Sequence, residues 1–311
     1  MNFKKIHFFI FLILISFTLN AHTIRFDINI DYNTKFKPEM GQRLQHSNTL
    51  TFIDQNILLY TNNWKMTNGE AISPLSIHYL INAGVGKFLV GLIYSKYNYI
   101  GFYNSYNDLT KNYLEKKIDN YEQKIQTYEI GYEFNIIENL IMSVAMGNKN
   151  LNREIKWHGL TSVSNNFYGE DTSVSTNSNG LYQKVKLEYF FIPNISAFIQ
   201  YSFGILKGDV NYQDNIFTSS LFSFINSIGW KNNINFNEAI VGVNFKINEI
   251  SKIKVAAKQL QYMVSYDNTY IIFNSLNPSS IFQFQLPAIW SKYFDDTRTS
   301  FLVGYEYNLN F

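Results

Sequence analysis

The residues able to carry out acid–base or metal chemistry are thinly spread along this chain. After residue 21 its histidines are His22, His46, His78 and His158, and no two stand at the spacing of a metal-binding pair. The chain has no cysteine, which excludes a thiolate metal site and a disulfide framework. The sequence therefore predicts neither a metal site nor a bound cofactor.

His46 and Ser47 are the only adjacent residues that invite a base–nucleophile interpretation. Neighbouring side chains on a strand point to opposite faces, so the two could not act together from one strand. They also fall in a long polar segment, and we interpret them as loop residues.

Strands must position whatever chemistry the chain has, because apolar residues recur with a period of two. The last eleven residues place six large apolar side chains on one face: Phe301, Val303, Tyr305, Tyr307, Leu309 and Phe311. Similar alternation recurs over residues 24–32, 75–81, 88–94, 128–134, 140–146, 185–191, 195–203, 239–245 and 253–257. These runs predict ten strands.

Connections between these runs alternate strictly between short and long. Tight turns are expected near residues 82–86, 136–139, 192–194 and 248. The long polar segments are 33–73, 99–121, 156–179, 208–233 and 266–297. This asymmetry is typical of outer-membrane barrels, which have short periplasmic turns and long extracellular loops. We predict that residues 22–311 form one closed, antiparallel, up-and-down transmembrane β-barrel with five long extracellular loops and periplasmic termini. Strand-like runs within 33–73 and 266–297 leave twelve strands as the alternative.

Both ends of the chain agree with export to a bacterial outer membrane. Residues 1–21 have two lysines, an apolar run and a closing Ala21, as in a secretory signal peptide. The aromatic C-terminal strand ending at Phe311 resembles the terminal strand that the assembly machinery of outer-membrane barrels reads, so this machinery is an expected partner. A formal charge of only +2 gives no reason to expect nucleic acid as a partner.

Placing the apolar faces toward lipid turns a set of charged residues of both signs inward. A barrel of about this size is filled by its own side chains, so we expect these charges to pair and close the interior. The inward set is Arg25, Asp27, Asp31, Glu129, Glu133, Lys184, Lys186, Glu188, Glu238, Lys246, Lys252, Lys254, Lys258 and Glu306.

Several local features make the chain similar to the omptins, the outer-membrane proteases of Gram-negative bacteria. Trp64-Lys65 precedes the second strand, and the run Ile199-Gln200-Tyr201-Ser202 is similar to the seventh omptin strand. Residues 235–269 match the following hairpin in length and pattern. The resemblance implies a ten-stranded barrel that contacts lipopolysaccharide through basic residues on its outer strands, for which Lys149 and Arg153 are the candidates.

The omptin catalytic motifs, Asp-x-Asp on the second loop and Asp-x-His on the fourth, are absent from this chain. The corresponding positions carry Asn107-Asp108-Leu109 and Asn211-Tyr212-Gln213, and neither Asn nor Gln can accept a proton at neutral pH. A site built differently could use Asp108, Asp209 and Asp214, which are the remaining catalytic candidates.

The sequence thus predicts an outer-membrane surface protein of omptin-like architecture, without protease activity, whose extracellular segments bind a ligand. The alternatives are an omptin-type endopeptidase with an altered site and a narrow pore for small solutes.

Overall fold

Ten long strands make up nearly all of the described chain. The computed structural model describes residues 22–38, 60–107, 113–163, 166–218, 223–270 and 296–311. The strands are β1 (His22–Pro38), β2 (Tyr60–Ala83), β3 (Gly86–Asn107), β4 (Tyr113–Ile137), β5 (Leu140–Val163), β6 (Asn166–Ile192), β7 (Ile195–Thr218), β8 (Ser223–Lys246), β9 (Ser251–Tyr270) and β10 (Asp296–Asn310). None of the described residues forms a helix long and apolar enough to cross a membrane.

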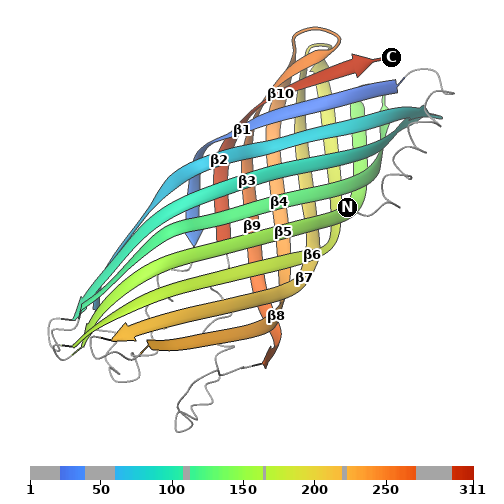
Figure 1. Cartoon of the computed structure of the whole chain (residues 1–311). Coiled ribbons are helices and arrows are strands. Elements are labelled where there is room, and N and C mark those ends of the chain that lie inside the picture. Colours follow the sequence, from blue (N-terminus) through green and yellow to red (C-terminus); the bar gives the residue numbers. More distant parts are fainter. Residues whose placement is uncertain (1–21, 39–59, 108–112, 164–165, 219–222, 271–295) are drawn as a thin grey trace.

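The strands close into a single antiparallel barrel (Figure 1). Each strand pairs with its neighbour in the sequence, and β1 closes the ring by pairing with both β2 and β10. The closing register sets Ile24 opposite Leu309 and Tyr32 opposite Phe301. This confirms the predicted fold and its count of ten strands in preference to twelve.

All four predicted tight turns lie where the alternation placed them. The turn between β2 and β3 has two residues, and Gly84 there has a φ of 63°. That conformation is in the left-handed region, which a residue without a Cβ adopts at little cost. Two further turns, at 138–139 and 193–194, also have two residues between the strands they join.

The structure differs from the prediction at the long loops, because the strands continue far into the segments predicted to be loops. Much of 99–121, 156–179 and 208–233 is paired strand, and only 108–112, 164–165 and 219–222 fall outside the described residues. The expectation of long loops is corrected in these three places. The outward side chains that are described in these stretches are polar, as Asn177 on β6 and Asn211 on β7 illustrate, and such a face suits contact with water.

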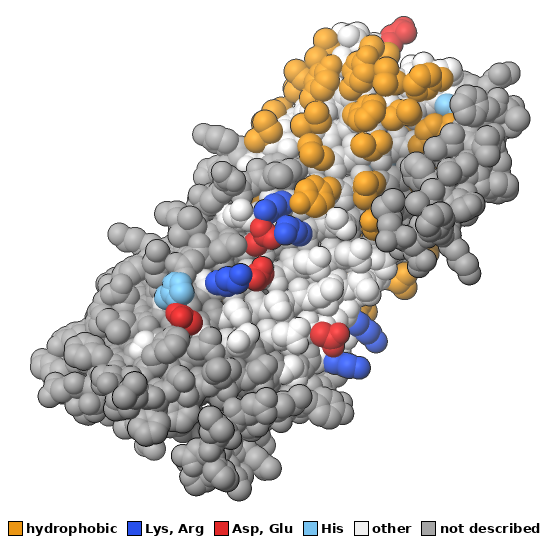
Figure 2. All heavy atoms as spheres, viewed as in Figure 1, with side chains coloured by type: hydrophobic (Ala, Val, Ile, Leu, Met, Phe, Trp, Pro, Cys, Tyr) orange, Lys and Arg blue, Asp and Glu red, His pale blue; other side chains and the backbone are white. Residues whose placement is uncertain are grey.

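Among the side chains that the structure describes, nearly all the exposed large apolar ones lie toward the end of the barrel that carries the short turns. We call these side chains the lipid belt; examples are Ile28, Leu92, Ile130, Met146, Ile199, Ile205, Val241, Val255 and Val303. Figure 2 shows them gathered over the end of the molecule at which β10 ends. An outward apolar band with a polar interior is what a barrel in a bilayer requires. The barrel is therefore a transmembrane one.

The strands are much longer than the belt. Spanning the hydrocarbon takes about 9–11 residues of a tilted strand, whereas β4 has 25 residues and β7 has 24. The excess forms what we call the upper wall, residues 96–107, 113–126, 148–163, 166–179, 207–218 and 223–235. In its described part the outward side chains are polar, as Asn148 and Asn152 on β5 illustrate.

The two parts of the barrel have opposite hydrophobic patterns. In the belt the outward residues are apolar and the inward ones are mostly polar. In the upper wall the described outward residues are polar, and fully buried apolar residues such as Leu151, Ile155, Val174, Val210 and Ile234 face inward among buried polar ones such as Arg153, Thr176 and Ser178. On β7 the change falls between Ile205, which is exposed, and Leu206, which is buried. A strand that leaves the membrane thus shifts its apolar alternation by one residue.

Candidate functional site

The belt encloses a network of buried ion pairs that begins near the short turns. Arg25 on β1 donates two hydrogen bonds of 3.1 Å to the carboxylate of Glu133 on β4. Its Nε also lies 3.5 Å from Glu306 on β10. Lys252 lies 3.4 Å from Glu306 and 3.8 Å from Glu188, so it links two carboxylates. This network crosses the interior from β1 to the opposite wall.

The Glu188 carboxylate accepts hydrogen bonds from three further side chains. Lys186 donates to it at 2.8 Å, the hydroxyl of Ser196 at 2.6 Å and the side-chain amide of Asn244 at 2.8 Å. Each partner projects from β6, β7 or β8. A carboxylate with this many donors keeps its charge without needing water.

Further from the turns, Glu129 on β4 is the centre of a second cluster. It is 2% exposed, lies 2.8 Å from His78 Nε2 and accepts a hydrogen bond from Lys184. The imidazole of His78 packs against the backbone of Gly91, where a Cβ would lie only 2.2 Å from the ring. Glycine is therefore required at position 91 for His78 to lie flat against β3.

Two lysines of β9 extend this layer of charge. Lys254 lies 2.6 Å from Asp27, and Lys258 lies 3.1 Å from Asp31. The hydroxyl of Tyr97 donates a 2.7 Å hydrogen bond to the same Asp31. Of the charged residues predicted to face inward, all but Lys246 take part in ion pairs, as expected for an interior closed by its own side chains.

Cations stacked on aromatic rings form the boundary between this network and the apolar interior of the upper wall. The ammonium of Lys149 lies 4.0 Å from the ring centre of Phe236 and 5.3 Å from that of Tyr182. The guanidinium of Arg153 lies 4.6 Å from the ring centre of Tyr262. Such contacts stabilise a cation that has been removed from water.

This placement corrects the prediction for Lys149 and Arg153. They are only 5% and 2% exposed and face the interior, so neither can contact lipopolysaccharide outside the barrel. The physical reason is the strand's own alternation: even-numbered residues of β5 face outward from Met146 to Asn152, so the odd-numbered Lys149 and Arg153 face inward.

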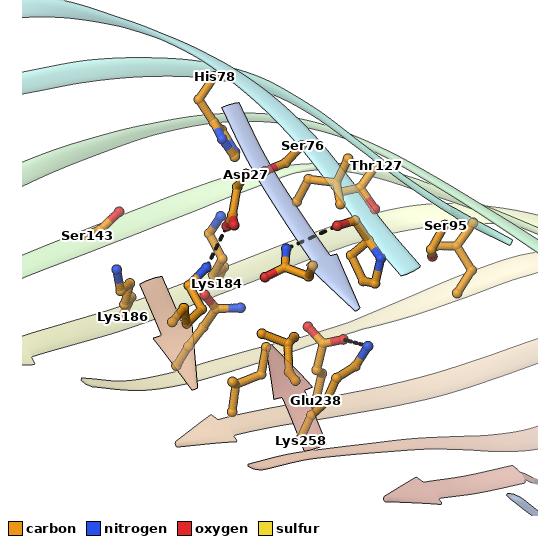
Figure 3. Close-up of a pocket in the computed structure, with 18 of the residues that line it drawn as sticks. Asp27, Ser76, His78, Ser95, Thr127, Ser143, Lys184, Lys186, Glu238 and Lys258 are labelled. Atoms are coloured by element: carbon orange, nitrogen blue, oxygen red, sulfur yellow. Dashed lines mark hydrogen bonds and ion pairs between the residues drawn. The ribbon is translucent and has the colours of Figure 1, made fainter. Parts of the chain in front are cut away.

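A cavity of about 140 Å³ lies between the charged network and the stacked cations. Figure 3 shows its wall, with Lys184 and Lys186 on β6, Glu238 on β8 and Lys258 on β9. The volume is enough for several water molecules. It is too small for a peptide, so the interior offers no binding cleft for a protein substrate at this level.

The catalytic candidates are not brought together within the described structure. Asp209 is exposed on the outer face of β7, and so are Asn211 and Gln213 at the positions where omptins carry their Asp-x-His pair. Asp214 lies in the same strand with its backbone opposite Thr172, and its side chain is not described. Asp108 and the pair His46-Ser47 lie outside the described residues.

The two histidines near the ends of the described barrel have structural partners. His22 stacks on Tyr79 at 5.6 Å between ring centres, and His158 pairs with Asp171 on the outer surface. Among the residues that the structure describes, no group of three His, Asp or Glu side chains could hold a metal ion.

Sequence reasoning had placed Glu129 and Lys184 in the interior but had missed His78. Its position between the outward Ile77 and Tyr79 was the available signal, because the alternation that exposes those two turns His78 inward.

No protein-family model matches the chain, and no curated protein matches it. Among solved structures, the chain is similar to the outer membrane protease OmpT from Escherichia coli, with 9% identity over 93% of this chain and 97% of that one and a TM-score of 0.45. It is also similar to the toluene transporter TodX of Pseudomonas putida, with 9% identity over 96% and 92% of the two chains and a TM-score of 0.36. At these identities and scores the likeness goes no further than the architecture of an outer-membrane barrel.

Proposed function

We propose that this protein is a non-conducting outer-membrane barrel that holds a polar binding surface above the membrane. The observation that carries the proposal is the reversal of the hydrophobic pattern along β5, β6, β7 and β8. Below the reversal the barrel suits lipid, and above it the same strands form a water-facing wall with an apolar core. A protein whose only role was to cross the membrane would have no need of the upper wall.

The upper wall presents a continuous row of polar side chains across five strands. The pairing register aligns outward residues of β4 to β8 in this order: Gln126, Asn150, Asn179, Lys207 and Asn233. Amide side chains each offer donors and an acceptor. A flat row of them is suited to an uncharged, hydrogen-bonding ligand such as a glycan.

Lipopolysaccharide contacts are proposed for a different set of cations from the one expected. Lys124, Lys207 and Lys231 are exposed on the outer face just beyond the belt. Phosphate groups at the membrane surface would be within reach of such side chains, whereas Lys149 and Arg153 are enclosed.

The topology can be tested with single cysteines, because the natural chain has none. In intact cells, a membrane-impermeant thiol reagent is expected to label Asn152→Cys on the upper wall and not Val85→Cys in the turn after β2, where Val85 is 87% exposed. Permeabilising the outer membrane should make both variants reactive. Labelling of Val85→Cys alone in intact cells would show that the barrel is inserted the other way round.

Conductance tests the closed interior. Reconstituted in planar bilayers, the protein is expected to show no stable openings comparable to those of a general porin, because ion pairs and the apolar core of the upper wall fill the bore. The unmodified protein is compared with the double variant Leu206→Gly with Val210→Gly, in which two fully buried side chains of that core are removed. Steady large currents from the unmodified protein would favour the pore instead.

Proteolysis is not part of the proposed function. Asn211 and Gln213 cannot act as general bases, and both face outward on β7, away from the interior. An endopeptidase with an altered site would need Asp108, Asp209 and Asp214 to converge, and Asp209 faces outward as well.

A further inference from the structure

Lys149 differs from every other cation around the interior cavity. Six basic side chains line that cavity: Arg25, Lys149, Lys184, Lys186, Lys254 and Lys258. Five of them have a carboxylate partner. Arg25 pairs with Glu133, Lys184 with Glu129 and Lys186 with Glu188. Lys254 pairs with Asp27, and Lys258 pairs with Asp31. Lys149 forms no ion pair with any residue in the part of the chain that the structure describes.

The two aromatic rings beside Lys149 satisfy only one side of its ammonium. Phe236 and Tyr182 lie against it, and both rings are themselves buried. A protonated lysine carries three N–H donors and no acceptor. The side chain is 5% exposed and lines the cavity, so its remaining donors face the cavity. Burying a charge without a partner is strongly unfavourable, so an acceptor is expected there.

We propose that the cavity binds a small inorganic anion, of the size of a halide, at the ammonium of Lys149. The anion would take the position that a carboxylate occupies beside each of the other five cations. Thr127 is directly opposite Lys149 in the β4–β5 register and also lines the cavity, so its hydroxyl can serve as a second donor. Figure 3 labels Thr127 and Lys184 among the residues that line the cavity.

The size of the cavity agrees with such an occupant. A cavity of about 140 Å³ accommodates one halide ion together with a few waters. The other five cations of the lining are each neutralised by a carboxylate, which leaves Lys149 as the cation that an anion would complete.

Bromide can serve as the probe. The wild-type barrel, Lys149→Met and the control Lys156→Met are unfolded by urea in lipid vesicles while bromide replaces gluconate at constant ionic strength. Lys156 is on the outer face of β5, where it pairs with Glu154. A tenfold rise in bromide above its dissociation constant should raise the folding equilibrium constant of wild type and Lys156→Met by up to about tenfold. The Lys149→Met variant should not respond.

An equal response in all three proteins, or none in wild type, would overturn the proposal. Because Lys149→Met could fail to fold, bromide is also located directly, by anomalous diffraction from wild-type crystals soaked at the concentrations used for unfolding. A peak next to the Lys149 ammonium supports the site. Density there without anomalous signal, or peaks only on the outer surface, would exclude it.

Discussion

Replacing Glu129 with Met is expected to destabilise the barrel by about 3–5 kcal/mol, the usual cost of removing one partner from a buried ion pair. Glu129 is 2% exposed and is the shared partner of Lys184 and His78. Without it the Lys184 ammonium remains enclosed with no compensating charge. The measurement is reversible urea unfolding in lipid vesicles, followed by circular dichroism.

Glu122 provides a matched control on the same strand. It also binds two lysines, Lys96 at 2.6 Å and Lys124, but on the outer surface of the upper wall. Exposed pairs contribute at most about 1 kcal/mol, so Glu122→Met should change stability little. Similar losses for the two variants would contradict the distinction between the interior network and the surface pairs.

A second substitution separates charge from packing at Glu129. In the double variant Glu129→Met with Lys184→Met, no lysine charge is left uncompensated beside position 129, so part of the lost stability should return. A double variant less stable than Glu129→Met alone would mean that the ion pair itself, and not the unpaired lysine, dominates the loss.

The sequence predicted the barrel well because two of its signals are local. Alternation over runs such as 195–203 and 301–311 requires only that one face meet lipid, and the tight turn at Gly84 requires only a residue that tolerates positive φ. Neither depends on which strands lie side by side. Closure of β1 on β10 then follows from an even number of antiparallel strands.

The sequence did not predict the upper wall, because the apolar residues there change from the outward to the inward face of the strand. Val210 and Leu206 lie on the opposite face of β7 from Ile199 and Ile205, so the outward apolar pattern appears to stop after Ile205. The outward alternation alone therefore predicts a loop after Ile205, although an inward apolar pattern begins there. On β5 the alternation through Met146 already turns Lys149 and Arg153 inward, and their expected outward position followed only from the omptin resemblance.

Partners in the interior network could not be read from the sequence for a different reason. Alternation assigns Asp27 and Lys254 to the interior, but their 2.6 Å contact joins β1 to β9, which are not neighbours in the sheet. Arg25 likewise reaches Glu133 across β2 and β3. Such contacts depend on the radius of the barrel and on the length of each side chain.

The reversal itself predicts a pattern of arginine tolerance along β7. Ile199 is 53% exposed within the lipid belt, and Ile199→Arg is expected to cost about 2–4 kcal/mol if it lies near the bilayer midplane. Asn211→Arg, on the same face of the same strand but in the upper wall, should be nearly neutral because its side chain meets water. Heat-modifiable migration and urea unfolding in vesicles would measure both.

Val210→Arg completes the test, because Val210 is adjacent to Asn211 but 0% exposed and points into the apolar core of the upper wall. An unpaired charge there should prevent folding or destabilise the barrel by several kcal/mol. Arginine is therefore expected to destabilise the barrel at outward positions in the belt and at inward positions in the upper wall. Equal tolerance of arginine at 210 and 211 would mean that this part of β7 is a solvated loop, and the upper wall would then have no core on which to hold a binding surface.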